Sequence, residues 1–271
     1  MVDEAERFDA QATYGAAAEV YEEASRLYWS FSAERTVQRL ALTPGMRVLD
    51  VACGTGTSAI PAAVTVGPSG SVLAVDYAEP MLDIARRKAA DLDLGQIEFR
   101  VADMTRLDLP AEGFDAVICV LGVFFVEDMA RLVSDLWRLV RPGGSLAITT
   151  LGPRVFTPVI DEWRSVVSSL RPGRSVSLPW QRTDHPDTVK RLMGEARVDS
   201  FEVRLESNRL PLVESGDVWR LVMGTGLRAV TTALGSDMET VRHHLEDWVG
   251  RSGVGEVDLD VIYATATKPD R

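Results

Sequence analysis

The sequence predicts an α/β fold in which a mainly parallel β-sheet carries helices on both of its faces. Between residues 46 and 150, five short apolar runs are interleaved with stretches whose apolar residues recur at helical spacing. The runs show no polar alternation, which is typical of strands buried on both faces of a parallel sheet. A composition of 46% hydrophobic and 25% charged residues is ordinary for a globular chain.

The five apolar runs define the strands expected in the first half of the chain. A helix is expected to begin at Glu79, with Met81 and Leu82 on its apolar face. A second helix is expected over 129–140, where it is followed by a turn that contains Pro142 and Gly143. The strands are expected at 46–52, 71–76, 97–103, 114–121 and 145–150.

The second half of the chain has a different pattern of apolar residues, which predicts more helix. The last run, 257–267, alternates in its first half as an antiparallel edge strand would. We expect one domain, made of a helical lid (1–45), a cofactor-binding core (46–152) and a part with cap helices and completing strands (153–271). In that last part, helices are expected at 155–180, 187–196, 217–230 and 237–249, and a strand at 200–206.

Charge and composition exclude several classes of partner. The chain has 40 acidic and 29 basic residues and a net charge of −11, whereas a nucleic-acid-binding surface needs clustered lysine and arginine. The acidic N-terminus lacks a signal-peptide core, and no apolar run approaches membrane-spanning length. The two cysteines and three histidines lack metal-site spacing. We expect a cytoplasmic protein that acts on a small molecule, without metal, nucleic acid or membrane, and of undefined oligomeric state.

The segment VLDVACGTG (48–56) carries the clearest chemical signal. A strand ends there in Gly54 and Gly56, which let the backbone approach a ligand closely, and a helix is expected near Thr57. The glycine spacing also fits a dinucleotide such as NAD. Asp50 opposes that interpretation, because a carboxylate beside a pyrophosphate is unfavourable, whereas it attracts the ammonium and sulfonium of S-adenosylmethionine.

Two further aspartates end the next two strands. Asp76 follows the glycines by about 20 residues, where a carboxylate accepts hydrogen bonds from ribose hydroxyls in either cofactor. Asp103, in the segment VADM, is placed to accept the exocyclic amine of adenine, with Met104 supplying a backbone contact. Three successive strands that each end in aspartate predict a nucleoside site more specifically than any one of them.

With these motifs in order, the chain resembles the class I S-adenosylmethionine-dependent methyltransferases, particularly the group similar to the ubiquinone/menaquinone C-methyltransferases. The resemblance is close over about 110 residues and looser before 40 and after 155. It implies a Rossmann-like, seven-stranded, mostly parallel sheet whose last strand is antiparallel. The matching segments are VLDVACGTG (48–56), AVDYAEPMLDIAR (74–86), VADM (101–104), FDAVICVLGVFFVED (114–128) and LWRLVRPGGSLAIT (136–149).

The resemblance also implies roles for individual residues. Asp50 and the turn from Ala52 through Cys53 and Gly54 to Gly56 would face the methionine part of S-adenosylmethionine, and Asp76 would face the ribose. Tyr77 and Met81 would cover the adenine, Asp103 would hold its amine beside Met104, and the carbonyl near Val120 would take the amino group. Tyr14, Tyr21 and Trp29 are candidates for the lid. Val120 departs from the polar residue that several relatives have there.

No fixed set of catalytic residues follows from the sequence. His185 and His244 are candidate bases, although a helix cap and a partly buried structural role are the simpler interpretations. Arg228 could hold an anionic substrate or form a surface ion pair. We expect methyl transfer to oxygen, nitrogen or carbon of a small molecule; the alternatives are an NAD(P)-dependent oxidoreductase and a non-methylating cyclase or regulator of the same fold. An aromatic set, expected mainly in the core and partly at the crevice, would favour an apolar or planar substrate: Trp29, Phe31, Phe124, Phe125, Phe156, Trp163 and Trp180.

Overall fold

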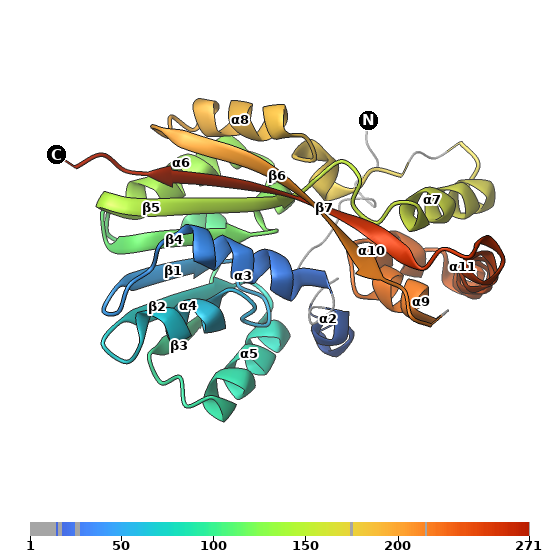
Figure 1. The fold of residues 1–271 in the computed structure, drawn as a ribbon, viewed down its shortest axis with the longest axis horizontal. Coiled ribbons are helices and arrows are strands. Elements are labelled where there is room, and N and C mark those ends of the chain that lie inside the picture. Colours follow the sequence, from blue (N-terminus) through green and yellow to red (C-terminus); the bar gives the residue numbers. More distant parts are fainter. Residues whose placement is uncertain (1–14, 16–17, 25–27, 174–175, 215, 271) are drawn as a thin grey trace.

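A computed structural model describes residues 15, 18–24, 28–173, 176–214 and 216–270. Its centre is a seven-stranded sheet in the order β3-β2-β1-β4-β5-β7-β6 (Figure 1). Strands β1 to β5 run parallel, and β7 is antiparallel to both β5 and β6. This confirms the predicted fold class. The strands are β1 (Arg47–Val51), β2 (Ser71–Asp76), β3 (Ile97–Val101), β4 (Phe114–Val120), β5 (Val140–Leu151), β6 (Phe201–Pro211) and β7 (Glu256–Thr267).

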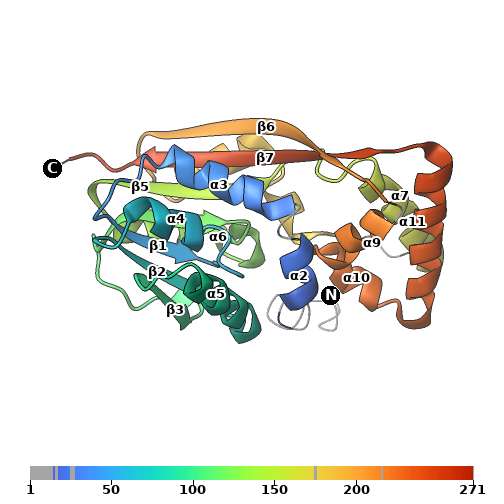
Figure 2. The same ribbon diagram turned by 60° about the horizontal axis from the view of Figure 1, so that its bottom comes forward.

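Helices cover both faces of the sheet. Helices α3, α4 and α5 lie on one face, and α6 and α8 lie on the other (Figures 1 and 2). The described helices are α2 (Ala18–Ala24), α3 (Ser30–Arg39), α4 (Ala59–Val66), α5 (Glu79–Asp91), α6 (Met129–Leu139), α7 (Val159–Leu170), α8 (Pro186–Glu195), α9 (Gly216–Met223), α10 (Leu227–Thr232) and α11 (Met238–Ser252).

The buried strand residues divide between these two layers, because successive side chains of a strand point to opposite faces. Val48 packs with the small residues Ala59 and Ala62 of α4, in the cluster on the α3–α4 side. Leu49 belongs to the larger cluster with Leu132 and Leu136 of α6. The absence of polar alternation in β1 therefore reflects burial on both faces, as predicted, whereas β3 at the sheet edge has no fully buried residue.

The prediction that the last strand forms the sheet edge is wrong. Strand β7 lies between β5 and β6, and most of its residues are buried, including Val261, Ile262 and Ala264. At this end of the sheet the edge strand is β6, in which exposed residues such as Glu202 and Arg204 flank the partly exposed Val203. Alternation in 257–267 comes from acidic residues near its start, of which Asp260 is buried beside Arg154 at 3.1 Å.

Two helical predictions in the second half also need correction. The segment 155–180 holds one shorter helix, α7, and then the short 3₁₀ turn η5 (Pro179–Arg182). The segment 217–230 is split into α9 and α10 where Gly224 and Gly226 interrupt it, since glycine is a poor helix former. Helices α7, α9, α10 and α11 gather beyond one end of the sheet, where the paired strands β6 and β7 extend (Figures 1 and 2). Within the described parts of the chain, no helix is both long and apolar enough to cross a membrane.

Candidate functional site

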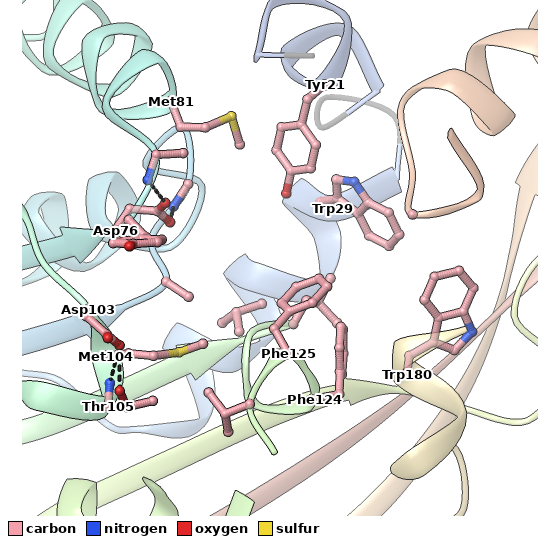
Figure 3. Close-up of a pocket in the computed structure, with 18 of the residues that line it drawn as sticks. Tyr21, Trp29, Asp76, Met81, Asp103, Met104, Thr105, Phe124, Phe125 and Trp180 are labelled. Atoms are coloured by element: carbon pink, nitrogen blue, oxygen red, sulfur yellow. Dashed lines mark hydrogen bonds between the residues drawn. The ribbon is translucent and has the colours of Figure 1, made fainter. Parts of the chain in front are cut away.

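A cavity of about 410 Å³ opens at the carboxyl ends of the central strands. Its wall is formed by the loops after β1, β2, β3 and β4 together with residues of α2, η5 and the α9–α10 turn. Figure 3 shows two sides of this cavity: Asp76, Met81 and Asp103 on one, and Phe124, Phe125 and Trp180 on the other. The volume lies in the range of small-molecule sites, and the carboxyl edge is where parallel sheets bind ligands.

The glycine turn after β1 is shaped by backbone conformations that favour glycine. Gly54 and Gly56 have φ angles of 54° and 81°. Gly54 lines the cavity, whereas Gly56 packs against α5: a Cβ added there would lie 3.2 Å from the Cβ of Ala85. Ala52, with φ of 58°, also lines the cavity. Cys53 is buried and lies outside the lining.

Asp76 ties the glycine turn to the loop after β2. Its Oδ2 accepts a hydrogen bond from the backbone N–H of Gly54 at 2.8 Å, and its Oδ1 accepts one from Ala78 at 2.9 Å. Burial raises the pKa of Asp76, and the hydrogen bonds from the backbone act in the opposite direction. The carboxylate therefore fixes the shape of the cavity wall that it also forms. Tyr77 and Met81, which follow it, line the same wall.

Asp103 and Met104 line the cavity at the end of β3, as the sequence pattern indicated. The Oδ1 of Asp103 accepts hydrogen bonds from the backbone N–H of Thr105 at 2.8 Å and from its hydroxyl at 2.7 Å. This local capping holds the carboxylate in place at the start of the short turn η3 (Met104–Arg106).

The structure places Asp50 differently from the expectation. Asp50 is fully buried, lies outside the cavity lining, and accepts a hydrogen bond from the Ser58 hydroxyl at 2.7 Å. It is two residues after Val48, so its side chain points to the α4 face, and Ser58 directly precedes α4. Burial raises its pKa to about 7. Its Oδ1 has no hydrogen-bond partner within the described residues.

The remaining cofactor candidates fall into three groups. Val120 lines the cavity at the end of β4, beside Leu121. Trp29 also lines it and is buried, and Tyr21 of α2 lies beside it in Figure 3. Tyr14 lies outside the described residues.

Aromatic side chains form the end of the cavity opposite Asp76 and Asp103. From the expected aromatic set, Phe124, Phe125 and Trp180 line it together with Trp29. Phe156 and Trp163 are instead fully buried in the core, and Phe31 packs under Arg35. We call Trp29, Phe124, Phe125 and Trp180 the aromatic end. The sequence reasoning missed two wall residues near it, Thr225 and Gly226.

The histidines and Arg228 lie outside the cavity lining. The Nδ1 of His185 accepts a hydrogen bond from the backbone N–H of Asp187 at 3.3 Å and caps α8, which confirms the simpler interpretation. The Nε2 of His244 lies 2.5 Å from Oε1 of Glu162 on α7. The segment GTGLR (224–228), which ends in Arg228, contributes Thr225 and Gly226 to the lining but not Arg228.

The charged side chains of the cavity lining are all acidic. It contains the carboxylates of Asp76, Asp103 and Glu127, and no lysine, arginine or histidine among the residues that the structure describes. The same described residues contain no cluster of three or more metal-ligating side chains. Such a wall suits a ligand with cationic groups and hydroxyls better than one with phosphates.

Comparison with known proteins agrees with this geometry. Residues 48–144 match the family described as "Methyltransferase domain". Nocamycin O-methyltransferase from Saccharothrix syringae is 35% identical over 144 residues, which are 53% of this chain and 50% of that protein. Demethylmenaquinone methyltransferase from Listeria monocytogenes serotype 4a is 31% identical over 136 residues, 50% of this chain and 56% of that protein. The matches thus span about half the length of these curated relatives.

The fold has close structural counterparts. Phosphoethanolamine N-methyltransferase 2 from Haemonchus contortus, solved in complex with S-adenosyl-L-methionine, superposes with a TM-score of 0.60 at 15% identity, covering 97% of this chain and 60% of that one. Residues 48–144 are thus similar to a methyltransferase domain, and the fold resembles that of an S-adenosylmethionine-binding methyltransferase. The cap helices and the last two strands of the sheet lie beyond this matched region.

Proposed function

We propose that this chain is an S-adenosylmethionine-dependent methyltransferase with a small-molecule acceptor, and that its core, lid and cap act as one domain around one cavity. The observation that carries the proposal is the set of strand ends: Asp76 and Asp103 face a cavity without lysine, arginine or histidine in its described lining. A nicotinamide dinucleotide would bring a pyrophosphate to the same wall, where carboxylates repel it. The relatives are named methyltransferases, which supports the same choice.

The residues present fit the cofactor. Asp76 would accept hydrogen bonds from the ribose hydroxyls, while Tyr77 and Met81 would cover the adenine and Asp103 would hold its amine. The backbone of the turn at Ala52–Gly54 and the carbonyl near Val120 would receive the methionine part. Asp50 would act indirectly, because it lies outside the lining and its bond to Ser58 connects the end of β1 with the start of α4.

The chemistry needs little from side chains beyond alignment. S-Adenosylmethionine, when bound, supplies a methyl group on an activated sulfonium. The chain then has to hold the acceptor in line with that methyl and keep water away from the reaction. The aromatic end keeps water away from the reaction, since Trp29, Phe124 and Trp180 are almost fully buried and face the cavity.

Methyl transfer is tested with cofactor that carries a tritiated methyl group and a panel of phenolic, amine and carbon-acid acceptors. The proposal expects label in an organic product, with S-adenosylhomocysteine formed in equal amount, and loss of both in Asp76→Ala. If NAD(P) stabilised the chain in a thermal shift experiment and S-adenosylhomocysteine did not, the oxidoreductase would replace the methyltransferase as the proposed function.

A further inference from the structure

Half of the aromatic end of the cavity is built by parts of the chain outside the matched methyltransferase domain. Trp29 precedes residues 48–144, and Trp180 and Gly226 follow them, whereas Phe124 and Phe125 lie inside. The domain that is shared with relatives therefore supplies the polar side of the cavity. The features that distinguish one acceptor from another have to be sought mainly in the added segments.

Gly226 allows Trp180 to lie directly against the backbone. A Cβ added at Gly226 would stand 2.6 Å from Cζ3 of Trp180, and 3.5 and 3.6 Å from its Cη2 and Cε3. The φ angle of Gly226 is −63°, which any residue can adopt, so the close approach to the indole is what requires glycine here. The position of the indole, and with it the width of the aromatic end, depends on this missing side chain.

Hydrogen bonds also fix the short turn η5 that carries Trp180. The backbone N–H of Leu178 donates to Oε1 of Gln181 at 2.8 Å, which closes the η5 turn around Trp180. Arg182, at the end of that turn, donates to the carbonyls of Val126 and Glu127, both at 2.6 Å. These bonds join η5 to the loop of Phe124 and Phe125. The backbone that carries Trp180 is thus tied to the neighbouring loop before any acceptor binds.

Trp29 adds a polar requirement to this apolar end. Its side chain lines the cavity and is 6% exposed, and its indole N–H has no hydrogen-bond partner in the described part of the chain. A buried donor without a partner is unfavourable, and an oxygen atom of a ligand would satisfy it. An ammonium group would not, because it offers only donors. An anionic group would meet the carboxylates of the lining, and the described lining offers it no lysine, arginine or histidine.

We infer that the aromatic end binds a flat, uncharged ring system that carries an oxygen, and that Gly226 sets the width of this site by letting Trp180 lie against the backbone. This inference rests on the proposed methyltransferase function and names the acceptor class for the same cavity. The oxygen bonds to the indole N–H of Trp29, and the ring packs among Phe124, Phe125 and Trp180.

The width of the aromatic end is tested with 2-naphthol, a flat and neutral probe. It is titrated by calorimetry in the presence of saturating S-adenosylhomocysteine. Gly226→Ala pushes Trp180 into the cavity and weakens 2-naphthol binding on the order of tenfold, while affinity for S-adenosylhomocysteine is retained. Gly194→Ala is the matched control, because a Cβ at this helical glycine meets nothing within 4 Å. Equal binding of 2-naphthol by both variants, or none by the native chain, overturns the inference.

Trp180→Phe provides an independent test, because it enlarges the same end instead of crowding it. It is expected to improve binding of the wider 9-phenanthrol relative to 2-naphthol. An unchanged ratio of the two affinities counts against the assigned width even if Gly226→Ala fails to fold.

The preference of the aromatic end for an uncharged ring with an oxygen is tested with probes of similar shape. The native chain should bind 2-naphthol more tightly than 2-naphthoate or 2-naphthylmethylammonium, and Trp29→Phe should remove the advantage of 2-naphthol over naphthalene. Tighter binding of the ammonium probe would make the aromatic end a cation site and overturn the inference. Failure of the native chain to bind S-adenosylhomocysteine would instead refute the proposed function, so the two failures are distinguishable.

Discussion

The two sides of the cavity are built by different means. On the β1–β3 side, short strands end in turns whose backbone N–H groups are tied to carboxylates, as Gly54 and Ala78 are tied to Asp76. On the cap side, the wall is formed by the shapes of large side chains, with Trp180 against Gly226. The first arrangement depends on a few residues at fixed spacing in the sequence. The second depends on contacts between segments far apart in the chain.

This difference separates cofactor recognition from acceptor recognition. Changes on the β1–β3 side should alter cofactor affinity or the stability of the core, whereas changes in the cap should leave both nearly intact. The variants described next test whether the two sides of the cavity have these separate roles.

The largest effect is expected for Asp50 and concerns stability. Because burial raises its pKa from 3.8 to about 7, the folded state binds an extra proton between these values, and stability falls as pH rises through this range. The loss amounts to on the order of 4 kcal/mol. Asp50→Asn should remove this part of the pH dependence in urea unfolding of the ligand-free chain. Parallel stability curves for the two proteins between pH 4 and pH 8 would show that Asp50 keeps an ordinary pKa.

The next largest effect is expected for Asp76 and is a loss of cofactor affinity. Asp76→Ala loses the acceptor for Gly54 and Ala78 and the carboxylate in the cavity wall, so affinity for S-adenosylhomocysteine should fall on the order of 100-fold. Asp91→Ala, an exposed change at the end of α5, serves as control in the same calorimetric titration. Equal affinity in both variants would remove Asp76 from the site.

A smaller effect is expected where the lid meets the core. Nζ of Lys88 lies 2.9 Å from Oε1 of Glu22 on α2 and donates to the Thr55 carbonyl in the glycine turn at 3.0 Å. Lys88→Met leaves the largely buried Glu22 without this cation and loosens α2, which carries Tyr21 of the cavity wall. Affinity for S-adenosylhomocysteine should fall on the order of tenfold.

The neighbouring pair provides the control for this prediction. Arg87 lies 2.9 Å from Glu19 on the same two helices, but both side chains are well exposed, at 64% and 79%. Exposed ion pairs contribute little, so Arg87→Met should leave the affinity almost unchanged. If both variants lost affinity equally, the contact of Lys88 with the glycine turn would have no special role.

The smallest effect is expected for the two histidines of the cap half. His185→Ala removes a helix cap and should lower stability by about 1 kcal/mol, without changing kcat for methyl transfer. His244→Gln, at the partly exposed contact with Glu162, should also leave kcat unchanged. A pH profile of kcat that lost a limb in either variant would identify that histidine as a catalytic base.

The sequence predicted the cofactor side of the molecule better than the cap side for a physical reason. Strand ends and glycine turns are local, so Asp76, Asp103 and Gly54 could be placed in the cavity wall from spacing alone. The direction of Asp50 required the pleat of β1 relative to α4, which only the packed layers define. Spacing gave its position at the strand end but not the face to which it points.

The errors in the second half have the same origin. Which strand forms the edge depends on the neighbours of β7, and its alternating start indicated exposure that β6 in fact covers. Gly226 was visible in the segment GTGLR, but its importance lies in the contact with Trp180, about 46 residues earlier in the chain. No periodicity within one segment can reveal a contact of this kind.

The central claim is that the wall formed by the strand ends selects a cationic nucleoside over a dinucleotide. Calorimetric titration of the native chain with S-adenosylmethionine and, separately, with NAD⁺ tests it most directly. We predict saturable binding of the first at one site per chain and no detectable heat from the second. Binding of NAD⁺ alone, or of neither compound, would contradict the account.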